Sequence, residues 1–193
     1  MTAYVVELQQ KVTLVKNAWA VLLTDAEGRQ THVAQVAQKR FALKEAVRID
    51  SPTGEALAFI QGRKVLEIAG TYDVVDAGGA VLASMAKDFK RSLGRSTFRV
   101  SVPGMELLVQ ERSEARAIAR RVWGLVQMVI EIPWFLPIQF DVVPAEGANA
   151  SPVATIDRQM KLRDHYRVEV SEPALDWRVA TAMAVAADAF MNR

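Results

Sequence analysis

The chain has 193 residues, enough for one sizeable hydrophobic core, and its 51% apolar and 24% charged residues are ordinary for a globular protein. The net charge of +2 is too small to steer the chain strongly toward nucleic acid, so a basic binding site would have to be a local patch. The absence of cysteine excludes disulfides, thiolate metal sites and thiol catalysis, and it is compatible with a reducing cytoplasm.

The N-terminal stretch "MTAYVVELQQKV" has no basic start followed by a long apolar run, so we expect no signal peptide. No stretch approaches the ~18 uncharged apolar residues of a spanning helix, so we expect no transmembrane segment.

Four turn signals follow at nearly equal intervals: "DAEG" ends at Gly28, "SPTG" at Gly54, "DAGG" at Gly79 and "VPG" at Gly104, which are 26, 25 and 25 residues apart. In these motifs Asp or Ser opens the turn, Pro presets φ and Gly supplies a positive φ. Each interval has room for two strands, which predicts a series of antiparallel hairpins.

Apolar and polar side chains alternate in residues 41–49, where Glu45 breaks the pattern, and in residues 96–102 and 165–170. Such alternation is typical of half-buried antiparallel strands, and about twelve candidate strands occur along the chain. We find no convincing linker, so residues 1–193 are predicted to form a single domain.

Residues 113–130, "SEARAIARRVWGLVQMVI", differ because their apolar side chains recur at helical spacing. Ser113 is suited to cap the helix, and Pro133 ends any helix soon afterwards. We predict an amphipathic helix here.

The C-terminal stretch "WRVATAMAVAADAF" predicts a second helix, at about 174–191. Residues 179–187 carry no charge and one polar side chain, Thr181, so the helix lacks a polar face and should be buried. Six of the fourteen residues quoted are alanine, which makes the helix slim. At 1.5 Å per residue it is about 20 Å long, as tall as a six-residue strand.

These elements fit a mainly β (α+β) fold in which about twelve antiparallel strands form a closed barrel around the C-terminal helix. Closure removes the sheet edges, and a barrel of this size needs something to fill its centre. Arg178 and Asp188 would then lie near the two mouths. In the alternative fold, the strands form a β-sandwich, and the C-terminal helix packs between this sandwich and the surface helix at 113–130. A membrane span is disfavoured, because the uncharged stretch covers about 14 Å of a roughly 30 Å hydrocarbon core.

Several segments resemble the tubby-like C-terminal superfamily, and specifically its LURP-one-related and phospholipid scramblase branches. They are "YDVVDAGGAVLASM", "FRV", "LPIQFDVVPA", "IDRQMKLRDHYRVEV" and "DWRVATAMAVAADAF". The most specific feature is the step Asp176, Trp177 and Arg178 before an alanine-rich helix. The resemblance implies a twelve-stranded barrel around a buried C-terminal helix. Tubby domains bind phosphoinositides through basic residues, but no such position aligns here. Scramblases are linked to calcium, but the acidic residues before the last helix are scattered here and make no ligand loop.

The enzymatic alternative depends on His165, since no nucleophile elbow, phosphate loop or metal-ligand spacing occurs. Its sequence neighbour Asp164 should point to the opposite face of the strand. We read His165 as an exposed strand residue and Asp73 and Asp76 as a solvated turn. No catalytic residue, metal or cofactor is therefore predicted.

Two basic groups are candidate lipid-binding sites. "KDFKRSLGRSTFR", residues 87–99, has five basic residues against Asp88, with Phe89 and Leu93 interleaved. The stripe Arg112, Arg116 and Arg120 lies opposite the apolar face of the predicted helix 113–130, a pattern typical of an interfacial helix. The alternatives are a solvated loop, and a helix lying across a barrel mouth whose arginines pair locally with Glu111 and Glu114. The candidate lipid-binding residues are Lys87, Lys90, Arg91, Arg95, Arg116 and Arg120.

We therefore predict a non-catalytic binding or scaffolding domain that associates weakly with an anionic phospholipid surface or with a protein partner, but not with nucleic acid. Its expected location is the cytoplasm, peripheral at the inner membrane face where it binds lipid. The oligomeric state stays open. Two alternatives remain: a carrier of a small apolar ligand at a barrel mouth, and an enzyme that uses His165 and nearby carboxylates.

Overall fold

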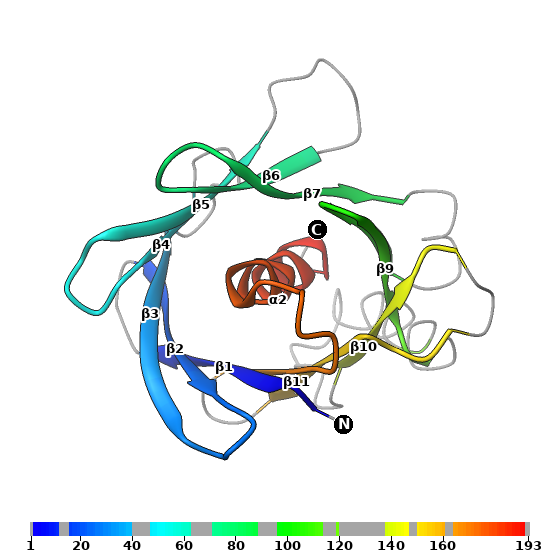
Figure 1. Cartoon of the computed structure of the whole chain (residues 1–193), viewed down its shortest axis with the longest axis horizontal. Coiled ribbons are helices and arrows are strands. Elements are labelled where there is room, and N and C mark those ends of the chain that lie inside the picture. The colour runs from blue at the N-terminus through cyan, green and yellow to red at the C-terminus, as the bar shows by residue number, and fades with distance from the viewer. Residues whose placement is uncertain are drawn as a thin grey trace, which may run out of the picture.

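The computed structural model describes residues 2–11, 16–39, 47–62, 71–88, 96–113, 119, 138–146, 150–160 and 164–191. Its strands form one closed barrel in which sequence neighbours pair antiparallel and the last strand pairs with the first (Figure 1). The predicted closed barrel of about twelve strands is confirmed. The strands are β1 (Tyr4–Lys11), β2 (Lys16–Thr24), β3 (Gln30–Lys39), β4 (Val47–Asp50), β5 (Ala56–Gly62), β6 (Thr71–Asp76), β7 (Val81–Lys87), β8 (Thr97–Val102), β9 (Met105–Glu111), β10 (Ile138–Pro144), β11 (Ala154–Met160) and β12 (Asp164–Val170).

Period-2 alternation places the apolar side chains in the barrel interior. In β12, Tyr166, Val168 and Val170 are buried, at 1%, 0% and 0% exposure. In β8, Phe98 and Val100 are likewise buried, whereas the Arg99 side chain between them is 52% exposed. These positions match the alternation predicted from the sequence.

The predicted glycine turns are also confirmed. Gly28, Gly54, Gly79 and Gly104 have φ values between 79° and 94°, a region in which other residues are strained. Asp76 shows how such a turn is held: its carbonyl accepts the Gly79 N–H at 3.0 Å, and its Oδ1 accepts the Ala80 N–H at 2.9 Å.

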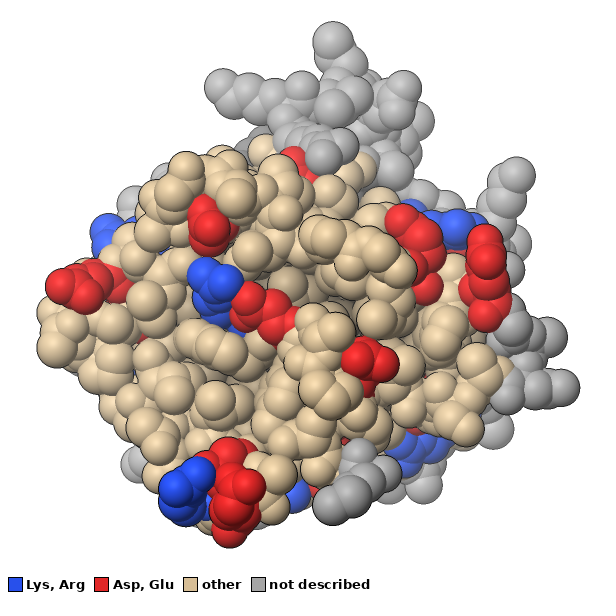
Figure 2. All heavy atoms as spheres, in the orientation of Figure 1, with Lys and Arg blue, Asp and Glu red and all other residues tan. Residues whose placement is uncertain are grey.

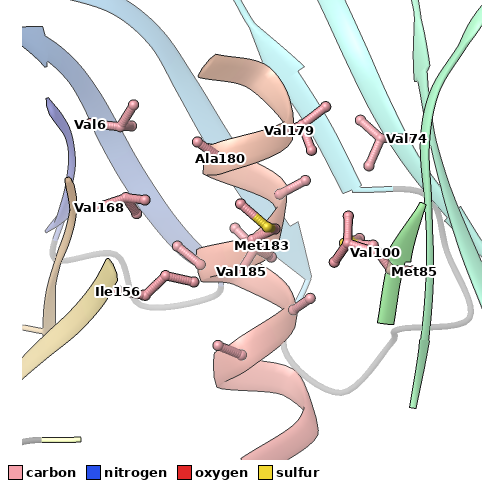
Figure 3. Close-up of a cluster of buried hydrophobic side chains, with 14 of the residues drawn as sticks. Val6, Val74, Met85, Val100, Ile156, Val168, Val179, Ala180, Met183 and Val185 are labelled. Atoms are coloured by element: carbon pink, nitrogen blue, oxygen red, sulfur yellow. The ribbon is translucent and has the colours of Figure 1, made fainter. Parts of the chain in front are cut away.

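The helix α2 (Trp177–Met191) lies within the ring of strands (Figure 1). Every residue from Val179 to Ala187 is buried, with no more than 6% exposure. Figure 3 shows α2 between two walls of the barrel, with Val6, Val168 and Ile156 on one side and Val74, Met85 and Val100 on the other. The residues that the sequence marks as uniformly apolar are therefore in contact with apolar side chains on several sides.

The start of α2 differs from the predicted start near residue 174. Asp176 is the N-cap, because its Oδ1 accepts the Arg178 N–H at 2.8 Å and its carbonyl accepts the Ala180 N–H at 3.0 Å. The preceding chain closes a turn in which the Leu175 N–H donates to the Glu172 carbonyl at 3.1 Å. This turn and the cap delay the helix to Trp177.

Because neighbouring strands are antiparallel, alternate connections lie at the same end of the barrel. We call one end the turn end; it carries the start of α2 and the connections 25–29, 51–55, 77–80, 103–104, 145–153 and 171–176. At the other, the far end, the chain leaves and re-enters the barrel through residues 12–15, 40–46, 63–70, 88–96, 112–137 and 161–163.

The predicted helix 113–130 falls almost entirely outside the described residues. The structure corrects one detail, since Arg112 does not belong to a helical stripe. Its backbone N–H donates to the Gln139 carbonyl at 2.8 Å, and its guanidinium pairs with the Asp141 carboxylate at 2.8 Å. Arg112 thus extends the pairing of β9 with β10. Within the described part of the chain, no helix is long and apolar enough to cross a membrane.

Candidate functional site

The first basic group begins at the end of β7. Lys87 is half-buried and lies opposite Phe98 of β8 in the strand register. Asp88 continues the pairing through its N–H, which donates to the Thr97 carbonyl at 3.0 Å, and its Oδ2 accepts a hydrogen bond from Arg99 Nε at 3.2 Å. Of the five basic residues between 87 and 99, Arg99 is therefore engaged by the only acidic residue of the segment. Three of the candidate residues, Lys90, Arg91 and Arg95, lie outside the described residues.

The second basic group, Arg116 and Arg120, also lies outside the described residues. The strands that flank it are described: β9 ends at Glu111 and β10 begins at Ile138, both at the far end. The chain between β7 and β8 starts and finishes at the same end, and β7 to β10 are consecutive neighbours around the barrel. The topology therefore brings the entry and exit points of both basic segments to one sector of the far end.

Two charged side chains point into the barrel near this end, and the sequence did not predict their burial. Glu111, the last residue of β9, is 3% exposed, and Arg158 of β11 is 9% exposed. The Arg158 guanidinium carbon lies 5.6 Å from the centroid of the Tyr166 ring, within reach of a cation–π contact. The burial of Arg158 could have been predicted from its alternation with Ala154 and Ile156, because this alternation places Arg158 on the inward face of β11.

At the turn end, polar contacts connect the N-terminal strand to the start of α2. The Tyr4 hydroxyl donates to the Leu175 carbonyl. Burial raises the pKa of Tyr4, and the negative charge of Asp176 raises it further. Arg178 Nη2 pairs with Asp176 Oδ2 at 2.6 Å, and this hydrogen bond raises the pKa of the guanidinium. These contacts fix the segment that leads from β12 into the centre of the barrel.

His165 lies on the outer face of the barrel wall, where the enzymatic alternative would place its chemistry. Its Nε2 is 3.8 Å from Glu7 Oε2, and the imidazole is 20% exposed. The other oxygen of Glu7 accepts a hydrogen bond from Arg167 Nη1 at 2.7 Å, and Arg167 Nε donates to Glu169 at 2.9 Å. The Glu7 carboxylate is thus part of a chain of ion pairs across β1 and β12. Sequence reasoning missed Glu7, which is distant in the chain. Nowhere in the described residues do three His, Cys, Asp or Glu side chains gather as a metal site.

A groove of about 470 Å³ lies at the turn end, where the β8–β9 hairpin meets the end of β10. The two parts are held together by the Ala145 N–H, which donates to the Glu106 carbonyl at 2.7 Å. The Glu106 carboxylate accepts a hydrogen bond from the Ser101 hydroxyl at 2.7 Å. The groove is lined by Val102, Gly104, Met105, Glu106, Pro144 and Glu146.

A closed barrel of twelve antiparallel strands with a helix inside it defines the class to which this protein belongs. A family model described as LURP-one-related matches residues 32–188, from β3 to near the end of α2. The chain therefore belongs to the LURP-one-related family, which is part of the tubby-like C-terminal superfamily. The predicted resemblance to LURP-one-related proteins is confirmed, whereas the resemblance to phospholipid scramblases stays a prediction. No curated protein and no solved structure gives a significant match.

Proposed function

We propose that this protein is a non-catalytic binding domain that docks weakly on anionic lipid surfaces through its far end. The observation that carries the proposal is topological: residues 88–96 and 112–137 both leave and re-enter the barrel in the same sector of that end. The two basic groups therefore act as one patch. Its residues are Lys87, Lys90, Arg91, Arg95, Arg116 and Arg120.

Charge supports this assignment. The ion pair between Asp88 and Arg99 engages the only acid of residues 87–99, so Lys90, Arg91 and Arg95 have no further acidic residue within that segment. Each positive charge near an anionic membrane surface contributes on the order of 1 kcal/mol. Three charges give roughly 3 kcal/mol, enough for reversible association, and screening over about 8 Å at physiological ionic strength makes the binding salt-sensitive.

The alternatives have less support. The family is generally non-enzymatic, and His165 lies on the barrel wall beside Glu7, a carboxylate already engaged by Arg167. A carrier of a small apolar ligand needs free space in the barrel, where the described part of α2 is packed against the walls. The cytoplasmic location and the single domain over residues 1–193 stay predictions.

The test is co-sedimentation of the full chain with phosphatidylserine-rich vesicles, with phosphatidylcholine vesicles as the reference. Two charge reversals address the patch: Lys90→Glu with Arg91→Glu, and Arg116→Glu with Arg120→Glu. Each pair should weaken binding to anionic vesicles by about 2 kcal/mol or more, which is about thirtyfold. The matched control is Arg29→Glu with Arg48→Glu, which changes the net charge equally but outside the basic patch, and it should bind like the parent.

Equal binding to anionic and neutral vesicles, or none to either, contradicts lipid docking. An effect of one reversal without the other contradicts the single patch. An equal loss in the control variant means that net charge, and not the far end, determines binding.

A further inference from the structure

The groove at the turn end combines apolar and acidic side chains on a rigid frame. Val102 and Met105 flank the two-residue turn between β8 and β9 and lie opposite each other in the strand register. Gly104 supports this tight turn with a φ of 79°. Opposite the hairpin, Pro144 closes β10, where it pairs with Leu107 of β9. The lining is therefore positioned by backbone pairing on both sides.

We call the apolar side chains of the lining, Val102, Met105 and Pro144, the floor of the groove. Val102 and Met105 pack against the core with one side and remain partly exposed on the other. Val81, at the start of the adjacent strand β7, is 51% exposed and is the most exposed large apolar side chain of the described residues. Val81 does not line the groove itself, so the apolar contacts of the groove come from Val102, Met105 and Pro144.

The two carboxylates of the groove, Glu106 and Glu146, differ from Asp25 and Asp176 of the turn end because, in the part of the chain that the structure describes, they have no ion pair with a local cation. Asp25 pairs with Arg29 at 2.8 Å and Asp176 with Arg178 at 2.6 Å. Within the described residues, neither groove carboxylate forms an ion pair: Glu106 accepts a hydrogen bond from the Ser101 hydroxyl, and Glu146 is exposed. Figure 2 shows acidic side chains at several separate places on this face, some of them next to basic ones. Two carboxylates that form no ion pair among the described residues thus line the same groove as Val102, Met105 and Pro144.

We propose that this groove binds a short basic segment of a protein partner, in which a Lys or Arg side chain lies next to an apolar one. The apolar side chain contacts the floor, and the cation lies between the two carboxylates. Charge complementarity favours a basic segment over an acidic or a purely apolar one and accelerates the encounter. About 470 Å³ is within the range of small binding sites and accommodates a few side chains rather than a whole domain.

The inference does not rest on lipid docking, because the groove and the basic patch lie at opposite ends of the barrel. If the far end is at a membrane, the turn end faces away from it and is accessible to a partner. The protein then connects a membrane surface to a basic protein segment.

The experiment is a titration of the isotope-labelled full chain, followed by NMR, with two capped peptides of equal length. One alternates Lys with Leu and the other alternates Glu with Leu, so the two share their apolar content. The basic peptide should shift the backbone signals of Gly104, Glu106 and Glu146, with a salt-sensitive dissociation constant, and the acidic peptide should not.

Two charge-reversal variants test the location of the site. Glu106→Lys with Glu146→Lys should weaken binding of the basic peptide at least tenfold while leaving vesicle binding at the far end no weaker than that of the parent. The control variant, Glu27→Lys with Glu55→Lys, makes the same charge change on other exposed turns of this end. At high salt, where long-range attraction is screened, its affinity for the basic peptide should stay within about twofold of the affinity of the parent.

Equal loss in both variants, or signal shifts spread evenly over all acidic turns, overturns the proposal in favour of unspecific attraction. No shift with the basic peptide also overturns it. Concentration-dependent shifts of the groove signals without peptide mean that a second copy of this chain occupies the groove, which overturns the assignment to a separate protein partner.

Discussion

The connection between β8 and β9 at the turn end differs in kind from the two connections beside it at the far end, β7–β8 and β9–β10. At the turn end, the hairpins close through connections as short as the two residues between Val102 and Met105, and four of them contain a glycine with positive φ. At the far end, nine residues separate β7 from β8 and 26 separate β9 from β10. The short connections define strand register locally, whereas the long ones leave sequence space for other roles.

Charge follows the same division. The turn-end connections and the strand ends beside them carry acids such as Asp25, Glu55, Glu106 and Glu146, while the far-end segment 87–95 is basic. A net charge of +2 conceals this polarity, because the two ends nearly cancel. The comparison teaches that the charges of the connecting segments are divided between the two ends of the barrel, which the overall charge does not report.

The largest expected effect comes from a substitution in α2, the helix inside the barrel. Ala184 of α2 is 0% exposed, so Ala184→Arg places an unpaired charge in the core. We expect a loss of several kcal/mol, comparable to the whole stability of a domain, and no cooperative unfolding transition. The measurement is chemical denaturation followed by circular dichroism. Ala174→Arg, in the exposed turn before the helix, is the matched control and should unfold like the parent; if Ala184→Arg does so as well, α2 is not the core.

An insertion compares the two ends directly. Four residues of Gly and Ser between Pro103 and Gly104 should cost about 1–2 kcal/mol or more, since they remove a tight turn that sets the register. The same insertion between Ser92 and Leu93 lengthens a nine-residue connection and should cost less than about 0.6 kcal/mol. Denaturant midpoints measure both. Equal costs at the two sites would break the distinction between the ends.

The cap of α2 gives an intermediate effect at the turn end. Asp176→Ala removes the N-cap acceptor and the partner of Arg178, and should cost about 1–2 kcal/mol. Asp176→Asn keeps a capping oxygen without the charge, so it should lose less than the alanine variant in the same denaturation assay. If the two variants are equally destabilised, the ion pair and not the cap stabilises the helix start.

The smallest effect is a pH dependence at the same junction. Burial and then the charge of Asp176 raise the pKa of Tyr4 in the folded protein. Above about pH 10, the ordinary pKa of tyrosine, the unfolded chain releases a proton that the folded protein retains, so the free energy of unfolding decreases as pH rises. Tyr4→Phe removes this contribution and should show a shallower decrease. A steeper decrease in the variant would contradict the assignment.

Local signals made most of the fold predictable. The turn glycines Gly28 and Gly104, the alternation around Phe98 and Val100, and the uniformly apolar stretch 179–187 each contain their information within a few residues. Barrel closure followed from the strand number and from the need to remove edges. The late start of α2 was missed because a cap and a preceding turn compete with helix propensity at residues 174–176.

The candidate sites were less predictable because they depend on distant pairings. Glu7 reaches His165 only because the first and last strands close the barrel. The groove forms where Glu106 and Pro144 meet, from segments that are far apart in the chain. Arg158 is inward-facing by alternation, although charged side chains are rarely buried. The basic residues were found from sequence alone, but their common sector needed the strand order.

The central claim is that the far end, and not the turn end, contacts a lipid surface. Because the chain has no cysteine, single cysteines at Ser92 and Ala26 can carry a polarity-sensitive fluorophore, one at each end of the barrel. Addition of phosphatidylserine-rich vesicles at low salt should shift the emission of the label at position 92 to the blue and leave the label at position 26 unchanged. A blue shift at position 26, or at neither position, would contradict the account.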